Sequence, residues 1–171
     1  MVPTPSSLRT RADYDDYWKQ VGYDFESYHD RYPDIPVYYI GGWYDIFLQG
    51  TLDNHQAMVE AGLESTLVVG PWSHENFGNV VGEIDFGIRA MRDSPVIVPD
   101  GGSWPEAQLS WLRGRLDALD GEPELELPPV RIFTMGRNEW RSEPSWPPPD
   151  ARDTELFLHT DGRLSADRPS A

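Results

Sequence analysis

Short apolar runs alternate with polar, helix-forming stretches in the first half of the chain. Residues 37–40 and 67–69 are rich in β-branched and aromatic side chains and are bounded by glycine and proline, a pattern typical of strands buried on both faces of a parallel sheet. Between them, apolar side chains from Leu48 to Val59 fall near helical spacing, and Gly62 stands where such a helix would end. The pattern predicts a strand–helix–strand unit with a right-handed crossover, which brings the carboxyl ends of both strands to the same edge of a sheet.

The second half of the chain predicts one more long helix and the start of a β region. Residues 104–119 regain helical periodicity, and we expect their leucines to share a face that packs on the sheet: Leu109, Leu112, Leu116 and Leu119. Residues 130–135 alternate as in a strand of a β-sandwich. Residues 156–159 begin another strand before a hairpin turn at Asp161 and Gly162. Because an isolated pair of strands is marginally stable, we expect this β domain to be incomplete.

Breaks in these patterns predict the domain organisation. A helix or turn is expected near residues 25–32, within a lead-in segment at residues 1–34. An α/β domain is expected at residues 35–119, followed by residues 120–128, which are acidic, rich in helix breakers and typical of a linker. The β domain would then begin at residue 129. The fold class predicted from the sequence is therefore α/β, with parallel strands and helices followed by the start of a β-sandwich.

The excess of acidic over basic residues limits the kinds of molecule that we expect the chain to bind. The chain has 171 residues, with 14 lysines and arginines against 29 aspartates and glutamates, a formal net charge of −15. This surplus argues against binding nucleic acid or an anionic membrane through a broad basic face. Hydrophobic residues make up 39% of the chain and include seven tryptophans, which is enough for a packed core.

The cysteine count and the first residues of the chain indicate the cellular compartment that we expect for the protein. The chain has no cysteine, which excludes disulfides, thiol catalysis and cysteine-ligated metals and fits a reducing compartment. Residues 1–9 contain no apolar segment of the kind found in signal peptides, and no run approaches the roughly 18 apolar residues that a membrane helix needs. We therefore expect a cytoplasmic protein without a membrane partner.

Two polar residues follow the predicted strands, at the edge where ligands of open α/β sheets gather. Asp45 comes just after the first strand and His74 just after the second. A carboxylate that accepts the imidazole N–H fixes the tautomer of a histidine, which can then act as a general base. From these residues alone, an equal alternative is a turn in which His74 is a capping residue.

A metal site is a further alternative at the same edge. Asp45, Asp53, His55 and His74 could supply ligands, but they lack the compact spacing of metal-binding motifs. His29 lies among Tyr28, Asp30 and Arg31, where we expect a solvated or capping role. No metal or cofactor is implied by these patterns.

Several separated motifs occur in a fixed order along the chain. They are GGWYDIF at residues 41–47, VVGPWSH at 68–74, FG at 86–87, PVRIFTMGRNEWR at 129–141 and WPPP at 146–149. In this order they resemble the cocaine esterase and X-Pro dipeptidyl-peptidase family of serine hydrolases. The resemblance extends from about residue 14 to about residue 164.

The resemblance implies an α/β-hydrolase domain with a helical cap, followed by a jelly-roll domain, and makes residues 1–34 the end of the cap. It maps the acid of a catalytic triad onto Asp45 and the base onto His74, and it suggests that Phe47 lines the acyl pocket. The implied reaction is acyl transfer to water from a small ester or an X-Pro peptide, through a Ser-Asp-His triad. Among the partners considered for the longer hydrolase that would contain this chain is a second copy of itself, in a homodimer.

The nucleophile of the family is missing from the sequence. In α/β-hydrolases the serine lies in a Gly-x-Ser-x-Gly turn before the acid, but no such turn precedes Asp45, and the nearest string, at residues 101–105, lacks the final glycine and follows His74. We therefore expect this chain to need the N-terminal half of the hydrolase as a partner and to be inactive alone. The alternatives are a non-catalytic binding module and one half of a split hydrolase.

Overall fold

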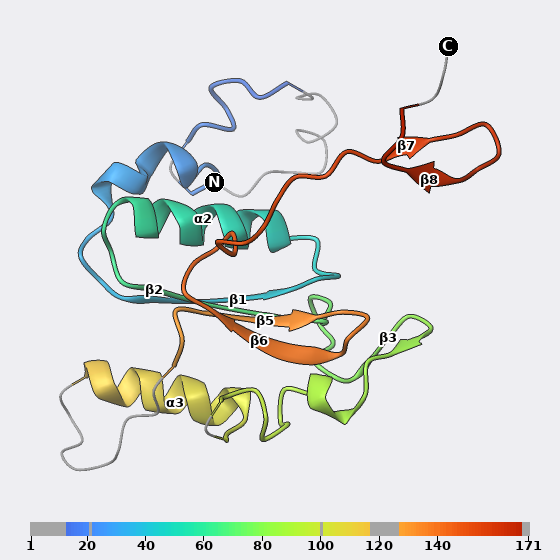
Figure 1. Ribbon diagram of the computed structural model, residues 1–171. Coiled ribbons are helices and arrows are strands. Elements are labelled where there is room, and N and C mark those ends of the chain that lie inside the picture. The colour runs from blue at the N-terminus through green and yellow to red at the C-terminus, as the bar shows by residue number, and fades with distance from the viewer. Residues whose placement is uncertain (1–12, 21, 100, 117–126, 169–171) are drawn as a thin grey trace.

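A four-stranded mixed sheet forms the centre of the computed structural model, which describes residues 13–20, 22–99, 101–116 and 127–168 (Figure 1). Its strands, in spatial order, are β1 (Val37–Gly42), β2 (Ser65–Gly70), β5 (Val130–Thr134) and β6 (Glu139–Glu143). β1 and β5 both run parallel to β2, whereas β6 is antiparallel to β5. Every residue of β2 is buried, as expected for a strand covered on both faces.

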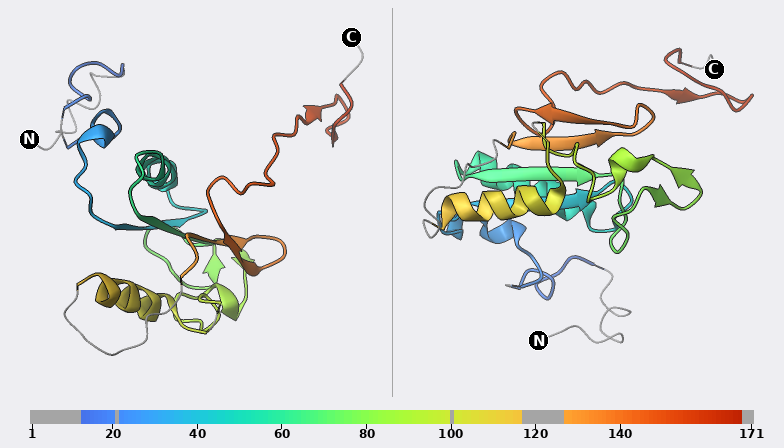
Figure 2. Two further views of the ribbon diagram at one scale, coloured as in Figure 1. Left: turned by 60° about the vertical axis from the view of Figure 1, so that its left-hand side comes forward. Right: turned by 90° about the horizontal axis from the view of Figure 1, so that it is seen from below.

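One long helix lies on each side of this sheet. α2 (Leu48–Glu60) and α3 (Trp104–Arg115) cover opposite faces, as the views in Figure 2 show. α2 connects β1 to β2 and completes the strand–helix–strand unit predicted from the sequence. The short 3-10 helix η1 (Glu26–Arg31) falls where a helix or turn was predicted and contacts α2.

Smaller elements occupy the rest of the described chain. A hairpin of β3 (Val80–Val81) and β4 (Ile84–Asp85) and the 3-10 helix η2 (Ile88–Ala90) lie between β2 and α3 in sequence. β7 (Phe157–Leu158) and β8 (Leu164–Ser165) form a separate hairpin that extends away from the sheet (Figure 1). Within the described residues, no helix has the length and apolar composition needed to cross a membrane.

The core is divided between the two faces of the sheet by the alternation of side chains along the strands. Leu67 and Val69 of β2 point to one face, where they pack with β5 and partly buried side chains of α2. Val68 points to the other face, where it joins Trp72 and Trp104. Tryptophan therefore fills much of the α3 side of the core, and Trp72 is 0% exposed.

The face of α3 that packs on the sheet differs from the prediction. Leu109, Leu112 and Leu116 are 49, 47 and 66% exposed, whereas Trp104, Ala107 and Trp111 are buried. Aromatic side chains bury a larger apolar area than leucine, so the helix turns its tryptophans inward. Leu119 lies outside the described residues.

Residues 130–135, which were predicted to begin a β-sandwich, contain β5, and this strand joins the four-stranded sheet. β5 pairs with β2, with Leu67 opposite Val130 and Val69 opposite Ile132, and its side chains share the cluster on the α2 face. β5 and β6 therefore extend the sheet of β1 and β2, whereas β7 and β8, like β3 and β4, form a separate two-stranded hairpin. Most of the predicted linker at residues 120–128 lies outside the described residues.

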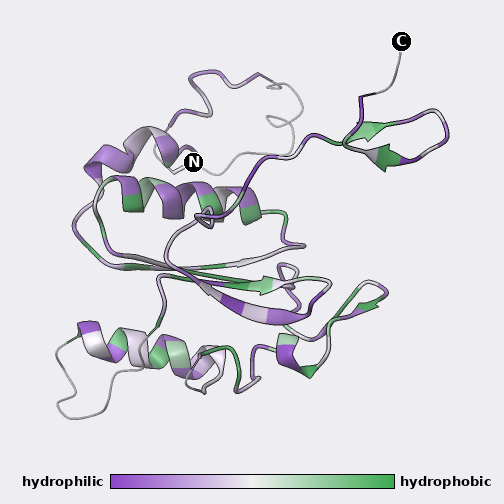
Figure 3. Ribbon diagram, in the orientation of Figure 1, coloured by the Kyte–Doolittle hydropathy of each residue, from purple (hydrophilic) through white to green (hydrophobic). Residues whose placement is uncertain are grey.

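The β7–β8 hairpin exposes apolar side chains. Leu156, Leu158 and Leu164 are 57, 69 and 59% exposed, and both strands are coloured as hydrophobic in Figure 3. Cross-strand pairing places Leu158 opposite Leu164. Isolated two-stranded hairpins are marginally stable in water, and these exposed leucines are not covered by other described residues.

A buried histidine of α2 predicts a pH-dependent stability of the fold. His55 is 1% exposed, its Nδ1 lies 2.7 Å from Ser65 Oγ, and desolvation lowers the pKa of His55 below its usual value. The unfolded chain therefore takes up this proton at a higher pH than the folded chain, so stability is lost as the pH falls from about 6.5 toward the lowered pKa. We expect the midpoint of urea unfolding to decrease between about pH 7.5 and about pH 5.

The variant His55→Gln is expected to weaken this pH dependence. His29→Gln is the matched control, because His29 is only partly buried and its Nε2 contacts Asn54 Oδ1 at 2.8 Å. Equal slopes of midpoint against pH for the wild-type chain and His55→Gln would show that His55 does not cause the effect.

Candidate active site

Asp45 lies on the loop that follows β1, at the carboxyl edge of the sheet. Main-chain hydrogen bonds fasten this loop to the one after β2, because the N–H of Trp43 donates to the Gly70 carbonyl and that of Tyr44 to the Trp72 carbonyl, each at 2.9 Å. The Asp45 side chain is 15% exposed, and its Oδ1 accepts the backbone N–H of Phe47 at 2.9 Å. The second carboxylate oxygen remains available for another donor.

His74 lies on the neighbouring loop and meets that oxygen. Its Nδ1 is 3.2 Å from Asp45 Oδ2, so the contact expected from the chain order is present. A proton on Nδ1 is donated to the carboxylate and leaves the lone pair on Nε2, which is the tautomer that a general base requires. The His74 side chain is 59% exposed, and the ring is therefore accessible to a reacting group.

Two glycines let these loops approach each other. A Cβ on Gly42 would overlap the carbonyl oxygen of Trp72, and a Cβ on Gly70 would overlap the Trp72 ring. The Trp72 ring is fixed in turn by a hydrogen bond from its Nε1 to the Ala90 carbonyl at 2.7 Å. Only glycine leaves the space for this packing, and the packing brings the loops of Asp45 and His74 side by side.

Phe47 lies against the histidine. The Phe47 and His74 ring centroids are 4.8 Å apart with an interplanar angle of 69°, and Phe47 is 57% exposed. Its neighbour Ile46 is 83% exposed. The structure thus places an accessible apolar surface next to the base, while the assignment of Phe47 to an acyl pocket stays a prediction.

The aromatic residues before the acid have different surroundings. Trp43 packs against the cluster on the α2 face. Tyr44 is 42% exposed and contacts Phe86, with ring centroids 5.9 Å apart. Sequence reasoning missed the part played by Trp72 and Gly42, for which the only signals were the paired glycines and the Gly-Pro-Trp string.

An open cavity of about 370 Å³ adjoins this edge. Residues 75–78, which directly follow His74, form one wall, and residues 91–93 form the other. The cavity contains charged residues of both signs, Glu75, Arg92 and Asp93, beside the ring of Phe77. No pattern in the sequence pointed to it, because the two walls are separated by the β3–β4 hairpin.

The residues considered as metal ligands have other partners. His55 is buried against Ser65, and Asp53 Oδ1 accepts a hydrogen bond from Gln49 at 2.7 Å. Within the part of the chain that the structure describes, no group of three or more histidine, cysteine, aspartate or glutamate residues is arranged to hold a metal ion. His29, expected to be solvated or capping, contacts Asn54 and joins η1 to α2.

Comparison with known proteins identifies the family. A family model described as X-Pro dipeptidyl-peptidase (S15 family) matches residues 3–76, and one described as X-Pro dipeptidyl-peptidase C-terminal non-catalytic domain matches residues 125–171. The cocaine esterase of Rhodococcus sp. (strain MB1 Bresler) is 34% identical over 153 residues, which are 88% of this chain and 24% of the esterase. The chain belongs to the cocaine esterase and X-Pro dipeptidyl-peptidase family.

Solved structures agree with this family and its hydrolase fold. An alpha-amino acid ester hydrolase is similar with a TM-score of 0.73 and 26% identity, over 97% of this chain and 27% of the hydrolase. An aminopeptidase from the marine sediment archaeon Thaumarchaeota archaeon has the same fold, with a TM-score of 0.73, 23% identity, and coverage of 97% and 26%. The chain spans about a quarter of the length of the relatives that it matches, and those relatives are esterases and peptidases.

Proposed function

We propose that this chain is the acid- and base-bearing part of a serine hydrolase that acts on small esters or X-Pro peptides. The observation that carries the proposal is the 3.2 Å contact between His74 Nδ1 and Asp45 Oδ2, at the carboxyl ends of two adjacent parallel strands. In this reaction a serine from another segment attacks the carbonyl carbon. His74 accepts the serine proton and returns it to the leaving group, while Asp45 orients the ring and stabilises the imidazolium.

The two edge strands of the sheet differ in charge, and this difference favours pairing of one of them with a separate segment that carries the serine. β6 bears alternating charges, Glu139, Arg141 and Glu143, and is largely hydrophilic in Figure 3; charges of this kind protect an exposed edge from further pairing. β1 has no charged residue, and among the described residues it pairs only with β2. Its outer edge therefore suits a further strand.

Backbone alternation specifies which groups that strand would meet. The N–H groups of Val37 and Trp43 donate toward β2 and its flanks, to Glu64 and Gly70. Because consecutive residues of a strand direct their backbone groups to opposite edges, the N–H groups of Tyr38, Ile40 and Gly42 face the open edge. They are the donors that would pair with the missing part of the hydrolase.

A chimera tests the proposal. This chain would replace the matching segment of the Rhodococcus cocaine esterase, and the hydrolysis of p-nitrophenyl esters would be measured for the chimera and for the 171-residue chain alone. We expect hydrolysis by the chimera and none above background by the chain, since the nucleophile and the oxyanion donors come from the other segment.

Two results would count against this assignment. Hydrolysis by the chain alone that is lost in His74→Ala would show that the chain holds its own nucleophile. A folded chimera whose weak activity is the same with and without His74→Ala would favour the non-catalytic binding module.

A further inference from the structure

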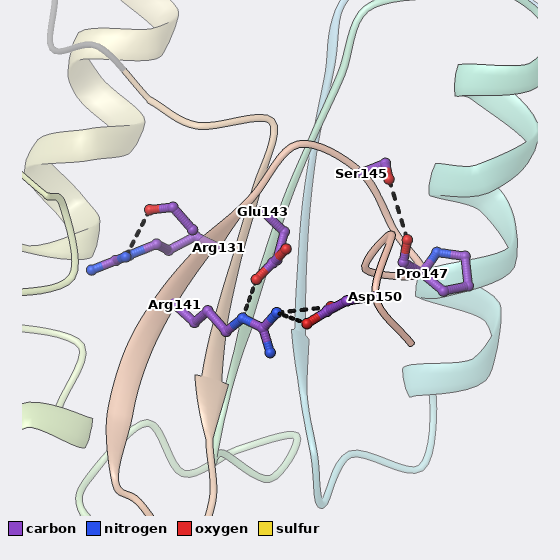
Figure 4. A network of polar contacts seen from close by, with 7 residues as sticks. Arg131, Arg141, Glu143, Ser145, Pro147 and Asp150 are labelled. Atoms are coloured by element: carbon purple, nitrogen blue, oxygen red, sulfur yellow. Dashed lines mark hydrogen bonds and ion pairs between the residues drawn. The ribbon is translucent and has the colours of Figure 1, made fainter. Parts of the chain in front are cut away.

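The connector after β6 is fastened back onto that strand by one arginine. Arg141 Nη2 donates to both carboxylate oxygens of Asp150, at 2.9 and 3.1 Å, and its Nε pairs with Glu143 (Figure 4). Glu143 is 7% exposed, so one partner of the arginine is fixed within the fold. The segment from residue 144 to residue 150 is therefore fixed at both ends, by its connection to β6 and by Asp150. Its middle packs against the sheet.

A tryptophan in the middle of this connector reaches the loop of the catalytic acid. The rings of Trp146 and Trp43 have centroids 6.1 Å apart with an interplanar angle of 46°. Trp146 also packs on the buried cluster of the α2 face, which includes Val69 and Ile132. The Trp43 ring is held a second time, because its Nε1 donates to the Phe133 carbonyl of β5 at 2.6 Å.

Trp43 stands two residues before Asp45, within the turn whose hydrogen bonds hold the acid loop beside the base loop. A change in the position of the Trp43 ring would move the backbone that leads to Asp45. Catalysis is sensitive to such shifts, because a displacement of about 1 Å can cost about a hundredfold in rate. Both anchors of the ring, Phe133 and Trp146, lie in residues 125–171, which match the domain described as non-catalytic.

We propose that this C-terminal segment positions the catalytic acid: Trp146, clamped through Arg141, holds Trp43 and thereby keeps Asp45 in contact with His74. Trp146 and Arg141 are positioning residues, since neither touches Asp45 or His74. A role of this positioning in catalysis rests on the proposed function. The positioning of Asp45 next to His74 does not, because the Asp45–His74 contact can be measured in the chain itself.

The test is ¹⁵N NMR of the His74 ring in the 171-residue chain, at about pH 8.5, where an ordinary imidazole is neutral. Chemical shifts of the two ring nitrogens report the ratio of the Nδ1–H to the Nε2–H tautomer, and His74→Gln assigns the signals. The wild-type chain is expected to favour the Nδ1–H form. Trp146→Ala and Arg141→Ala are expected to lower the ratio at least twofold, toward the value in Asp45→Ala, and Trp146→Phe to restore it.

The matched control is Arg163→Ala, which removes an exposed arginine whose carboxylate partner, Asp161, lies on the turn of the β7–β8 hairpin; it should leave the ratio unchanged. Asp150→Asn breaks the clamp at an exposed residue and decides the question if Trp146→Ala fails to fold. An unchanged ratio in Asp45→Ala would overturn the Asp45–His74 pair and with it the proposed function. A change in Asp45→Ala without any change in folded Trp146→Ala, Arg141→Ala or Asp150→Asn would overturn the positioning role alone.

Discussion

The variant Asp45→Asn is expected to lower kcat for ester hydrolysis by about 10⁴-fold in the chimera with the cocaine esterase, with a much smaller change in KM. Asp45 Oδ2 accepts from His74 Nδ1 while Oδ1 is held by the Phe47 N–H. An asparagine keeps the size of the side chain, but it carries no charge to stabilise the imidazolium and can donate to Nδ1, which selects the wrong tautomer. Steady-state kinetics with a p-nitrophenyl ester measure the effect.

Asp53→Asn is the matched control for that substitution. Asp53 is an exposed aspartate of α2 whose Oδ1 accepts from Gln49, so the same change of charge there should alter kcat less than twofold. An Asp45→Asn chimera that retains more than about a tenth of the wild-type kcat would be incompatible with a triad acid at this position.

The variant Trp72→Ala is expected to lower the free energy of unfolding by about 3–5 kcal/mol, the usual cost of truncating a buried aromatic side chain. Trp72 is 0% exposed, stacks on Trp104 with centroids 5.5 Å apart and contacts Trp140 at 5.6 Å. Alanine would leave a cavity between β2 and the segment before α3, and the Ala90 carbonyl would lose its donor. Urea unfolding followed by circular dichroism provides the measurement.

Leu112→Ala supplies the comparison within the same region. Leu112 lies on α3 and is 47% exposed, and we expect its truncation to cost less than about 1 kcal/mol. The pair of variants also tests which face of α3 packs on the sheet. A cost for Leu112→Ala equal to that of Trp72→Ala would mean that the leucine face is covered.

Local pattern and chain order were enough to predict the unit that carries the acid and the base. Residues 37–40 and 67–69 have the composition of buried strands, and the right-handed crossover leaves only one arrangement for the loops after them. The contact between Asp45 and His74 follows from that arrangement.

Where a pattern is compatible with two structural environments, the sequence could not predict which of the two the residues occupy. Residues 130–135 alternate as a half-buried strand does in either kind of sheet, and the choice of β2 as neighbour came from the fit of Val130 and Ile132 beside Leu67 and Val69. On α3, leucines and tryptophans both repeat at helical spacing. The larger aromatic area decided which face turned inward.

The sequence by itself determined that a carboxylate and an imidazole meet at one edge of a sheet, because both follow strands joined by a short crossover. Only the tertiary structure decided what holds that pair in place. Trp43 and Trp146 are far apart along the chain and belong to no common pattern, and their contact exists because β5 joins β2 and Arg141 folds the connector back over the sheet. Contacts of this kind depend on how separate elements pack, which local periodicity does not encode.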